Sequence, residues 1–297
     1  MNNFKIFEEE KITQFNQYIE EYLNKIQCHP FLKQAMLYSV KAGGKRIRPL
    51  LIFIILDALN TPISDDAYRV GSALELVHTY SLIHDDLPAM DNDDLRRGMP
   101  TNHKQFGEAI AILSGDALLT EAFKVITTSE SLAPALKVKL IDELSDASGP
   151  RAMIDGQVGD ILGEKTTYTL EQVQHVHEGK TGALLKYACL AGAQLANADK
   201  KQQELIVKYG ELFGLAFQIY DDILDVVGSQ EKLGKKVHKD LNENKNTYPN
   251  LLGLKGAQDK LDQVLFQIDD VLLKLEAQGT KIEFMKMILK YFKVGKI

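Results

Sequence analysis

The chain has 297 residues, of which 45% are hydrophobic and 26% charged, as is ordinary for a globular protein. Its formal net charge of −6 argues against a nucleic-acid binder that works by bulk electrostatics. The two cysteines, Cys28 and Cys189, fit neither a metal site nor a disulfide framework. No stretch approaches the roughly 20 apolar residues of a membrane span, and Met1 to Lys5 shows no secretion signal. We therefore expect no nucleic-acid partner, no membrane span and a cytoplasmic location.

Helical periodicity dominates the chain. Apolar residues recur at spacings of three and four in Phe15 to Ile26, in Val70 to Val77 and in Leu205 to Phe217. Thr61 to Asp66 has the pattern of a loop that leads into an N-cap, with acidic residues in the first helical turn. Clear alternating strand patterns are absent. The sequence predicts a single all-α domain of about ten helices that spans residues 1–297.

One region departs from the helical pattern. Gly228 to Pro249 is polar and rich in Gly, Asn and Lys, with lysines at positions 232, 235, 236, 239 and 245. It could be a solvated connection between helices, or a lid that carries cations over an anionic ligand. Its position directly after an acidic cluster makes the lid plausible.

Two aspartate clusters each follow an apolar helical segment. The first contains Asp85, Asp86, Asp91, Asp93 and Asp94, and the second contains Asp221, Asp222 and Asp225. On a wet surface two such carboxylates repel by less than about 1 kcal/mol, so either cluster alone could be a solvated helix face. Mg²⁺ typically takes one or two carboxylates and completes its shell with water and substrate phosphates. We therefore predict that both clusters line one cavity and share Mg²⁺ with a diphosphate.

Basic groups supply the other half of a diphosphate site. Gly43 to Pro49 places Lys45, Arg46 and Arg48 just before an apolar helix. Because Lys45 and Arg48 are three residues apart, they are expected to be neighbours on the first helical turn.

Arg96 and Arg97 follow the first aspartate cluster directly and can offer bidentate donors to phosphate oxygens. His78 lies seven residues before Asp85, which is two turns along the same helix face. By itself, a histidine such as His78 is more often a core residue, but its neighbours favour a role in the site. Gly179-Lys180-Thr181 looks like the end of a P-loop, but the earlier glycine and the preceding strand are missing.

Taken together, these residues resemble the short-chain trans-prenyl diphosphate synthases over nearly the whole chain. In the first half, the matching segments are Gly43-Gly44-Lys45-Arg46-x-Arg48-Pro49, His78-Thr79-Tyr80-Ser81-Leu82-Ile83-His84-Asp85-Asp86-x4-Asp91, Arg96-Arg97-Gly98 and Gly115-Asp116-Ala117-Leu118-Leu119. In the second half, they are Gly156-Gln157-x-x-Asp160, Lys180-Thr181-Gly182-Ala183-Leu184, Phe217-Gln218-x-x-Asp221-Asp222-Ile223-Leu224-Asp225 and Lys245-x-Thr247-Tyr248-Pro249. The chain departs from the family pattern at Met99 and His238.

The resemblance implies a helical isoprenoid-synthase bundle around a deep central cavity, a homodimer, and condensation of isopentenyl diphosphate with dimethylallyl or geranyl diphosphate. It implies three Mg²⁺ ions per site, with Mn²⁺ as a possible substitute. The implied metal residues are Asp85, Asp86, Asp91 and Asp221, with Asp160, Asp222 and Asp225 orienting waters and ligands. The implied allylic-substrate residues are Arg96, Lys180, Thr181, Gln218, Lys235 and Lys245, of which the first four would act in catalysis. The implied isopentenyl diphosphate residues are Gly44, Lys45, Arg48, His78 and Arg97.

Product length is expected to depend on Tyr80 and Ser81, which lie five and four residues before Asp85. An aromatic floor at Tyr80 would stop a growing prenyl tail early, and in the family this pattern resembles the bacterial farnesyl type, so we expect mainly the C15 product. The open alternatives are a geranyl or geranylgeranyl diphosphate synthase, or a non-catalytic subunit of a heteromeric synthase. A terpene cyclase is disfavoured by the second aspartate cluster. Asp93 and Asp94 are expected to be helix-start or surface acids.

Overall fold

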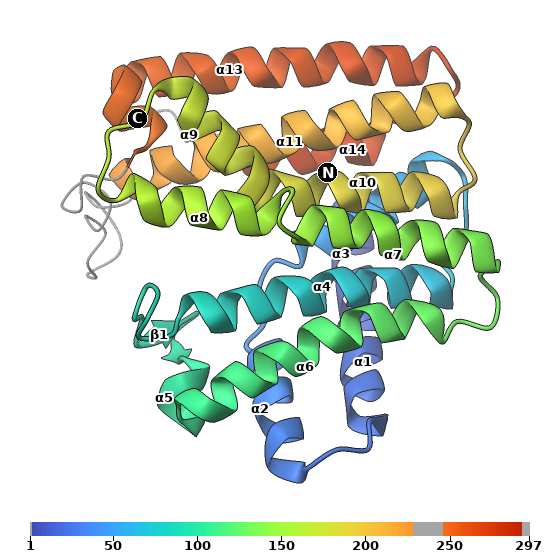
Figure 1. The fold of residues 1–297 in the computed structure, drawn as a ribbon. Helices are drawn as coiled ribbons and strands as arrows, with labels where there is room; N and C mark the ends of the chain where they lie inside the picture. The colour runs from blue at the N-terminus through green and yellow to red at the C-terminus, as the bar shows by residue number, and fades with distance from the viewer. Residues whose placement is uncertain (1, 228–245, 293–297) are drawn as a thin grey trace. The chain divides into compact units, whose positions relative to one another are not determined.

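The computed structural model describes residues 2–227 and 246–292, and these residues are predominantly helical (Figure 1). Within these ranges ten α-helices have 11 residues or more, as the apolar periodicity predicts. The all-α class is therefore confirmed.

The chain divides into two compact units. The first comprises Met1–Asp57 and Thr61–Asp142, and the second comprises Ala58–Asn60 and Glu143–Ile297. The expectation of one domain stays a prediction, and each unit is described by itself.

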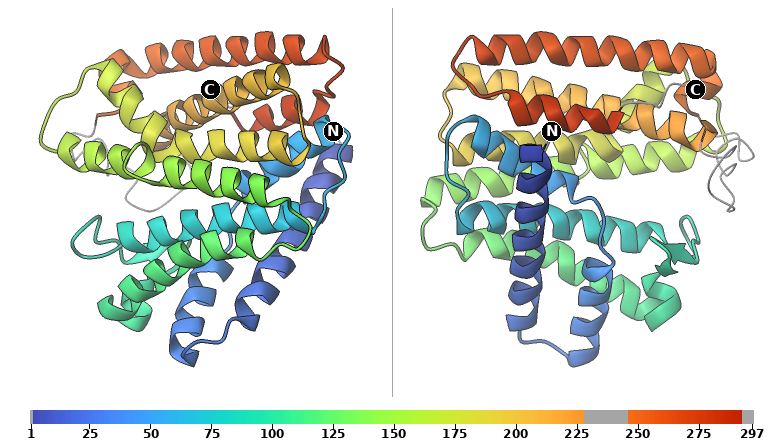
Figure 2. Two further views of the ribbon diagram at one scale, coloured as in Figure 1. Left: turned by 45° about the vertical axis from the view of Figure 1, so that its right-hand side comes forward. Right: turned by 180° about the vertical axis from the view of Figure 1, so that it is seen from behind.

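The first unit is built from helices joined by short loops. Their bounds are α1 Asn2–Lys25, α2 Pro30–Lys41, α3 Ile47–Ala58, α4 Asp65–Asp85, α5 Asn102–Phe106, α6 Glu108–Thr127 and the start of α7 Pro134–Ser148. Helices α4 and α6 pack along each other, and α1 lies beside α2 (Figures 1 and 2). Phe15 and Tyr68 pack edge-on against Phe53 in the core of this unit. Ser64 is the N-cap of α4, as the sequence predicts.

A short β-hairpin lies between α4 and α5, and the sequence pattern did not predict it. Its strands, β1 Leu95–Arg96 and β2 Met99–Pro100, are antiparallel, with Arg96 opposite Met99. Arg97 and Gly98 form the turn with φ angles of 54° and 79°. Positive φ at both central residues is the geometry that joins two twisted strands tightly.

The second unit contains the remaining helices. Their bounds are α8 Met153–Gly163, α9 Leu170–His177, the π-helical turn η1 Glu178–Gly182, α10 Ala183–Leu195, α11 Lys200–Val227, α13 Tyr248–Glu276, α14 Glu283–Met287 and the 3₁₀ turn η2 Ile288–Phe292. Helix α11 packs between α10 and α13 (Figure 1). Buried Tyr209 anchors this layer, since its hydroxyl donates to the carbonyl of Met285 at 2.8 Å.

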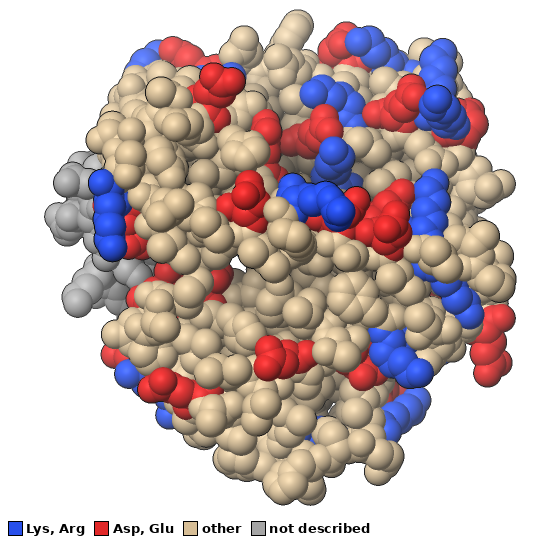
Figure 3. Space-filling view, in the orientation of Figure 1, with Lys and Arg blue, Asp and Glu red and all other residues tan. Residues whose placement is uncertain are grey.

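The described helices give no support to a membrane span, because none of them is both long and apolar enough to cross a bilayer. On the face shown in Figure 3, basic and acidic side chains are interspersed. That face therefore lacks the continuous basic stripe that binding to a nucleic-acid backbone requires.

Candidate functional site

The first aspartate cluster lies where α4 ends. Asp85 is the last residue of the helix and Asp86 is its C-cap. The following loop folds back, because the backbone N–H of Asp91 donates to the carbonyl of Asp85 at 2.9 Å. Asp85 and Asp91, two of the four aspartates expected to bind metal, thus belong to one closed loop, although six positions separate them in the chain.

Asp86 has a different environment from its neighbours. Its side chain is only 3% exposed, and its carboxylate accepts hydrogen bonds from the guanidinium of Arg96, with Nε at 3.0 Å and 3.3 Å from the two oxygens. Burial raises the pKa of the Asp86 carboxyl, and Arg96 acts against that rise. In this geometry the carboxylate orients Arg96, so the metal role expected for Asp86 competes with an ion pair and stays a prediction.

Asp93 and Asp94 begin no helix. Asp93 lies 3.8 Å from the guanidinium of Arg96, and Asp94 pairs with Lys104 at 2.8 Å on the surface. The helix-start interpretation was therefore wrong for both, while the surface interpretation holds for Asp94.

The basic loop before α3 has a left-handed backbone. Gly43, Gly44 and Arg46 have φ angles of 82°, 125° and 48°. Helix α3 begins only at Ile47, so Lys45 precedes the helix. The expectation that Lys45 and Arg48 share the first helical turn was wrong, because the chain turns at Arg46 before it becomes helical.

The absence of a side chain at Gly44 lets the guanidinium of Arg97 approach the backbone closely. A Cβ atom on Gly44 would lie 2.6 Å from the central guanidinium carbon of Arg97. The structure therefore brings these two residues together from segments more than fifty positions apart in the chain. The hairpin turn at Arg97 makes this approach possible.

Arg48 and His78 lie in the same strongly positive surroundings. Burial lowers the pKa of Arg48, Glu75 opposes that effect and nearby Arg97 adds to it, and the resulting pKa is about 10. Its buried Nε atom has no hydrogen-bond partner among the described residues. Removal from water lowers the pKa of His78 well below its usual value, and Arg48 and Arg97 add to that effect. His78 is therefore neutral at pH 7 and adds no positive charge beside these arginines.

Sequence reasoning missed one member of this group. Glu75, on α4, is 2% exposed and pairs with Nη1 of Arg46 at 2.6 Å. The available signal was a charged residue surrounded by Ala73, Leu74, Leu76 and Val77 in an apolar helix. A buried carboxylate in such a stretch requires a cationic partner.

The expected chain-length residues lie on α4. Tyr80 is 7% exposed, and its ring packs edge-on against His84 at a centroid distance of 5.7 Å. Ser81 is half-buried and donates a hydrogen bond to the carbonyl of His78 at 2.9 Å. Their part in determining product length stays a prediction.

In the second unit, Lys180 and Thr181 lie on the π-helical turn η1 between α9 and α10. Such turns are rare and occur frequently at functional sites. Nζ of Lys180 donates to Asp160 of α8 at 2.6 Å. The turn packs closely against Gly156 of α8: a Cβ added to this glycine would lie 2.2 Å from the backbone nitrogen of Lys180. Lys180 is thus fixed both through its backbone and through its ammonium group.

The second aspartate cluster is helical, as expected, and lies near the end of α11. Asp221 is exposed, whereas Asp222 is 8% exposed and accepts a hydrogen bond from the backbone N–H of Tyr248 at 3.0 Å. Asp222 therefore ties α11 to the first turn of α13. Gln218 is half-buried one turn before Asp222. Lys235, His238 and Lys245 lie outside the described residues.

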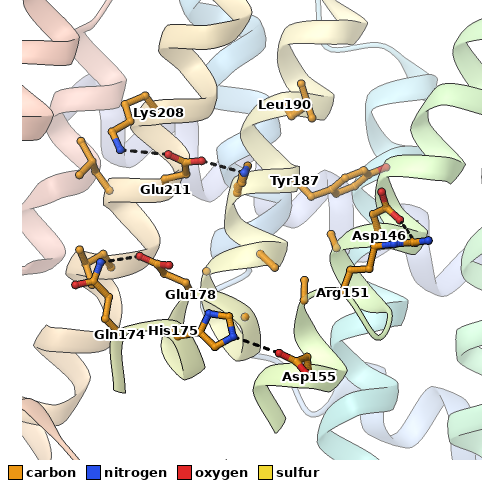
Figure 4. A pocket seen from close by; sticks show the side chains of 18 of the residues that line it. Asp146, Arg151, Asp155, Gln174, His175, Glu178, Tyr187, Leu190, Lys208 and Glu211 are labelled. Atoms are coloured by element: carbon orange, nitrogen blue, oxygen red, sulfur yellow. Dashed lines mark hydrogen bonds and ion pairs between the residues drawn. The ribbon is translucent and has the colours of Figure 1, made fainter. Parts of the chain in front are cut away.

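A groove of about 700 Å³ lies elsewhere in the second unit (Figure 4). It is bordered by ion pairs such as Glu211 with Lys186 at 2.9 Å and Arg151 with Asp146 at 2.6 Å. The side chains expected in the site, including Lys180, are absent from its described lining. The cavity volume alone therefore does not identify the functional site.

No three His, Cys, Asp or Glu side chains form a ready metal cluster among the residues that the structure describes. Mg²⁺ commonly binds through one or two carboxylates and completes its shell with water and phosphate oxygens. Asp85 and Asp91 offer hard oxygen ligands of this kind from one loop.

Comparison with known proteins places the chain in a family. The model of the family described as "Polyprenyl synthetase" matches residues 29–278. The chain is 49% identical over 243 residues to the farnesyl diphosphate synthase of Bacillus subtilis, covering 81% of this chain and 82% of that protein. It is 45% identical over 244 residues to the geranylgeranyl diphosphate synthase of Cyanophora paradoxa, covering 80% and 81%.

A solved structure supports the same assignment. The geranyltransferase from Helicobacter pylori complexed with magnesium and isoprenyl diphosphate aligns with a TM-score of 0.80 at 33% identity, covering 96% of this chain and 95% of that one. The motifs, the helical fold and these matches agree, and the chain belongs to the polyprenyl synthetase family.

Proposed function

We propose that this protein is a Mg²⁺-dependent prenyltransferase that joins isopentenyl diphosphate head-to-tail to dimethylallyl or geranyl diphosphate, with farnesyl diphosphate as the main product. The observation that carries the proposal is the closed loop of Asp85 and Asp91 beside the oriented guanidinium of Arg96. This is an arrangement that can hold a metal–diphosphate complex.

Asp85, Asp91 and Asp221 would hold the metal, up to three ions per site. When bound, Mg²⁺ would neutralise the charge that develops on the diphosphate leaving group. Arg96, already oriented by Asp86, adds a fixed cationic donor to the same diphosphate. Asp86 contributes mainly through Arg96 in this proposal.

Lys180 would bind the allylic diphosphate, and Asp160 holds its ammonium group in place. Thr181 and Gln218 would offer dipoles to the allylic cation without attacking it as nucleophiles. Lys235 and Lys245 remain proposed contributors to the same substrate.

Gly44, Lys45, Arg48, His78 and Arg97 would bind isopentenyl diphosphate. The excess positive charge around Arg48 and the unsatisfied Nε atom favour a dianionic ligand there. Neutral His78 can donate one hydrogen bond without adding further repulsion to the cations.

The reaction needs no side-chain base. The allylic C–O bond breaks, and the double bond of isopentenyl diphosphate forms the new C–C bond to the allylic carbon. The carbon next to the resulting cation then loses a proton to the departing diphosphate. Preorganised cations that interact more strongly with the leaving group as its charge grows lower the barrier to the first step.

The C15 product length rests on buried Tyr80. A homodimer, a cytoplasmic location, a single folded domain and the joint action of both aspartate clusters on one diphosphate belong to the same proposal.

The test is a product assay with purified protein, Mg²⁺, isopentenyl diphosphate and each allylic substrate in turn. We expect release of inorganic diphosphate and a C15 product from both dimethylallyl and geranyl diphosphate. A C10 or C20 main product would contradict the length assignment alone. If no diphosphate is released, the condensation itself is refuted, and a non-catalytic subunit becomes the better interpretation.

A further inference from the structure

Glu75 is a buried acid with no place in the mechanism described so far. It lies in the middle of α4, three residues before His78, and only 2% of it is exposed. Its carboxylate accepts from Nη1 of Arg46 at 2.6 Å. A buried carboxylate is costly to remove from water, so the fold keeps it only together with this partner.

Arg46 connects Glu75 to the basic loop. Besides Glu75, its guanidinium donates to the carbonyl of Val40 at the end of α2 at 2.5 Å and to Oδ1 of Asn16 on α1 at 3.0 Å. Three elements of the first unit thus hold one side chain. The backbone of Arg46 is left-handed, with φ of 48°, and a residue without Gly-like freedom takes this conformation only when its surroundings enforce it.

The turn enforced at Arg46 decides where its neighbours lie. Lys45 directly precedes it, and Arg48 is the second residue of α3, the helix that follows it. Gly44, one position further back, is the surface against which the guanidinium of Arg97 lies. A shift of this loop would therefore move three of the groups proposed to bind isopentenyl diphosphate.

The charge of Glu75 also acts on two arginines that it does not touch. Its negative charge raises the pKa of both Arg48 and Arg97, while removal from water lowers them. Arg46 pairs directly with this buried carboxylate, while Arg48 and Arg97 feel its charge from further away. The buried Nε atom of Arg48, which lacks a hydrogen-bond partner among the described residues, is consistent with a missing anionic ligand.

We propose that Glu75 is a positioning residue for the isopentenyl diphosphate site: through its pair with Arg46 it fixes the Gly43–Arg46 turn and so aligns Lys45, Arg48 and Arg97 on one diphosphate. This inference rests on the proposed function and adds to it a residue that does not touch the substrate.

Two physical effects of Glu75 have opposite signs, which makes the inference testable. If Glu75 acted only through its charge, it would repel the diphosphate, and removing the charge would strengthen binding. If it acts by positioning, its loss lets the cations move apart, and binding weakens. Glu75→Gln keeps the shape and one acceptor for Arg46 but removes the charge-assisted hydrogen bond.

The experiment measures steady-state kinetics of Glu75→Gln with each substrate varied in turn. We expect KM for isopentenyl diphosphate to rise about tenfold, while KM for geranyl diphosphate changes by less than about twofold. The matched control is Asp66→Asn, because Asp66 is a buried acid on the same helix that accepts from Ser129 and Ser131 outside this cluster. An unchanged or lower KM for isopentenyl diphosphate in Glu75→Gln, or the same selective rise in Asp66→Asn, overturns the inference.

A second variant guards against failure to fold. Arg46→Lys keeps a cation beside Glu75 but loses the planar set of donors to Val40 and Asn16, so we expect the same selective rise in KM. Both residues act through one contact. The variant that combines Glu75→Gln with Arg46→Lys should therefore have a KM for isopentenyl diphosphate no higher than that of the more affected single variant. Additive effects would contradict action through Arg46.

Calorimetric titration with isopentenyl diphosphate alone separates this inference from the proposed function. If the wild type binds the ligand and Glu75→Gln binds it about tenfold more weakly, the positioning role stands even where no condensation is seen. If both bind equally, the positioning role fails even though the enzyme condenses its substrates.

Discussion

Replacing Gly156 with alanine should displace the π-helical turn that carries Lys180. The added Cβ would lie 2.2 Å from the backbone nitrogen of Lys180 and 2.8 Å from both the carbonyl carbon of Gly179 and the carbonyl oxygen of Val176. These neighbours are backbone atoms, so no side-chain rotation can relieve the overlap. Moving the nitrogen from 2.2 Å to the 3.0 Å that real contacts tolerate requires a shift of 0.8 Å.

A shift of that size is large for a binding group. Lys180 lies 2.6 Å from Asp160, so the displaced turn would stretch or break this ion pair. A misplacement of about 1 Å can cost about 100-fold in rate, and we expect kcat/KM of Gly156→Ala to fall by about that factor. Overpacking should also lower the free energy of unfolding by about 1–3 kcal/mol, which the better helix propensity of alanine offsets by about 1 kcal/mol.

The assay combines release of inorganic diphosphate with urea unfolding. Gly159→Ala is the matched control on the same helix. Its added Cβ would lie 2.7 Å from Cγ2 and 3.8 Å from Cβ of Val176, and these side-chain atoms can move more easily than backbone. We expect this control to keep activity within about threefold of the wild type. Equal activity of Gly156→Ala and the wild type would refute the idea that this glycine positions Lys180.

Three further predictions concern the sites directly. Asp85→Ala and Asp221→Ala should each lower turnover by orders of magnitude at unchanged melting temperature, whereas Asp94→Asn, in a surface pair, should remain active; near-normal rates for the first two would contradict the metal assignment. Tyr80→Ala should lengthen the products beyond C15, as judged by chromatography, and an unchanged C15 profile would refute the floor at this position. Because the pKa of His78 is lowered in the folded state, its contribution to stability is present above pH 6.5 and is lost as the pH falls below that value, by at most about 1.4 kcal/mol per pH unit. In His78→Asn the free energy of unfolding by urea should decrease less between pH 7 and pH 5 than in the wild type. An equal decrease in the variant and the wild type would count against the lowered pKa of His78.

Much of the fold follows from residue pattern. Apolar spacings of three and four residues show which residues share a helix face, and an N-cap such as Ser64 marks where a helix begins. The β-hairpin at Arg97 escaped prediction because strands of two residues are too short to produce an alternating pattern.

The candidate site was predictable as a set of residue types, but its internal pairings were not. Acidic and basic clusters at fixed spacings point to metal and diphosphate chemistry whichever helix faces which. Two of these pairings depend on loops that fold back to the end of a helix. Arg96 donates to Asp86, and the backbone N–H of Tyr248 donates to Asp222. The spacing of apolar residues along the sequence does not indicate where such a loop folds back.

Residue order alone thus establishes the helical class, the family and the chemical character of the ligands, because these depend on local propensity and on side-chain type. Only the packed structure decides that Lys45 lies outside the helix, that Glu75 holds Arg46, and that Gly156 supports the turn of Lys180. The last two facts depend on contacts between segments well separated along the chain, where a buried charge such as Glu75 requires a cationic partner and a close backbone approach requires a glycine.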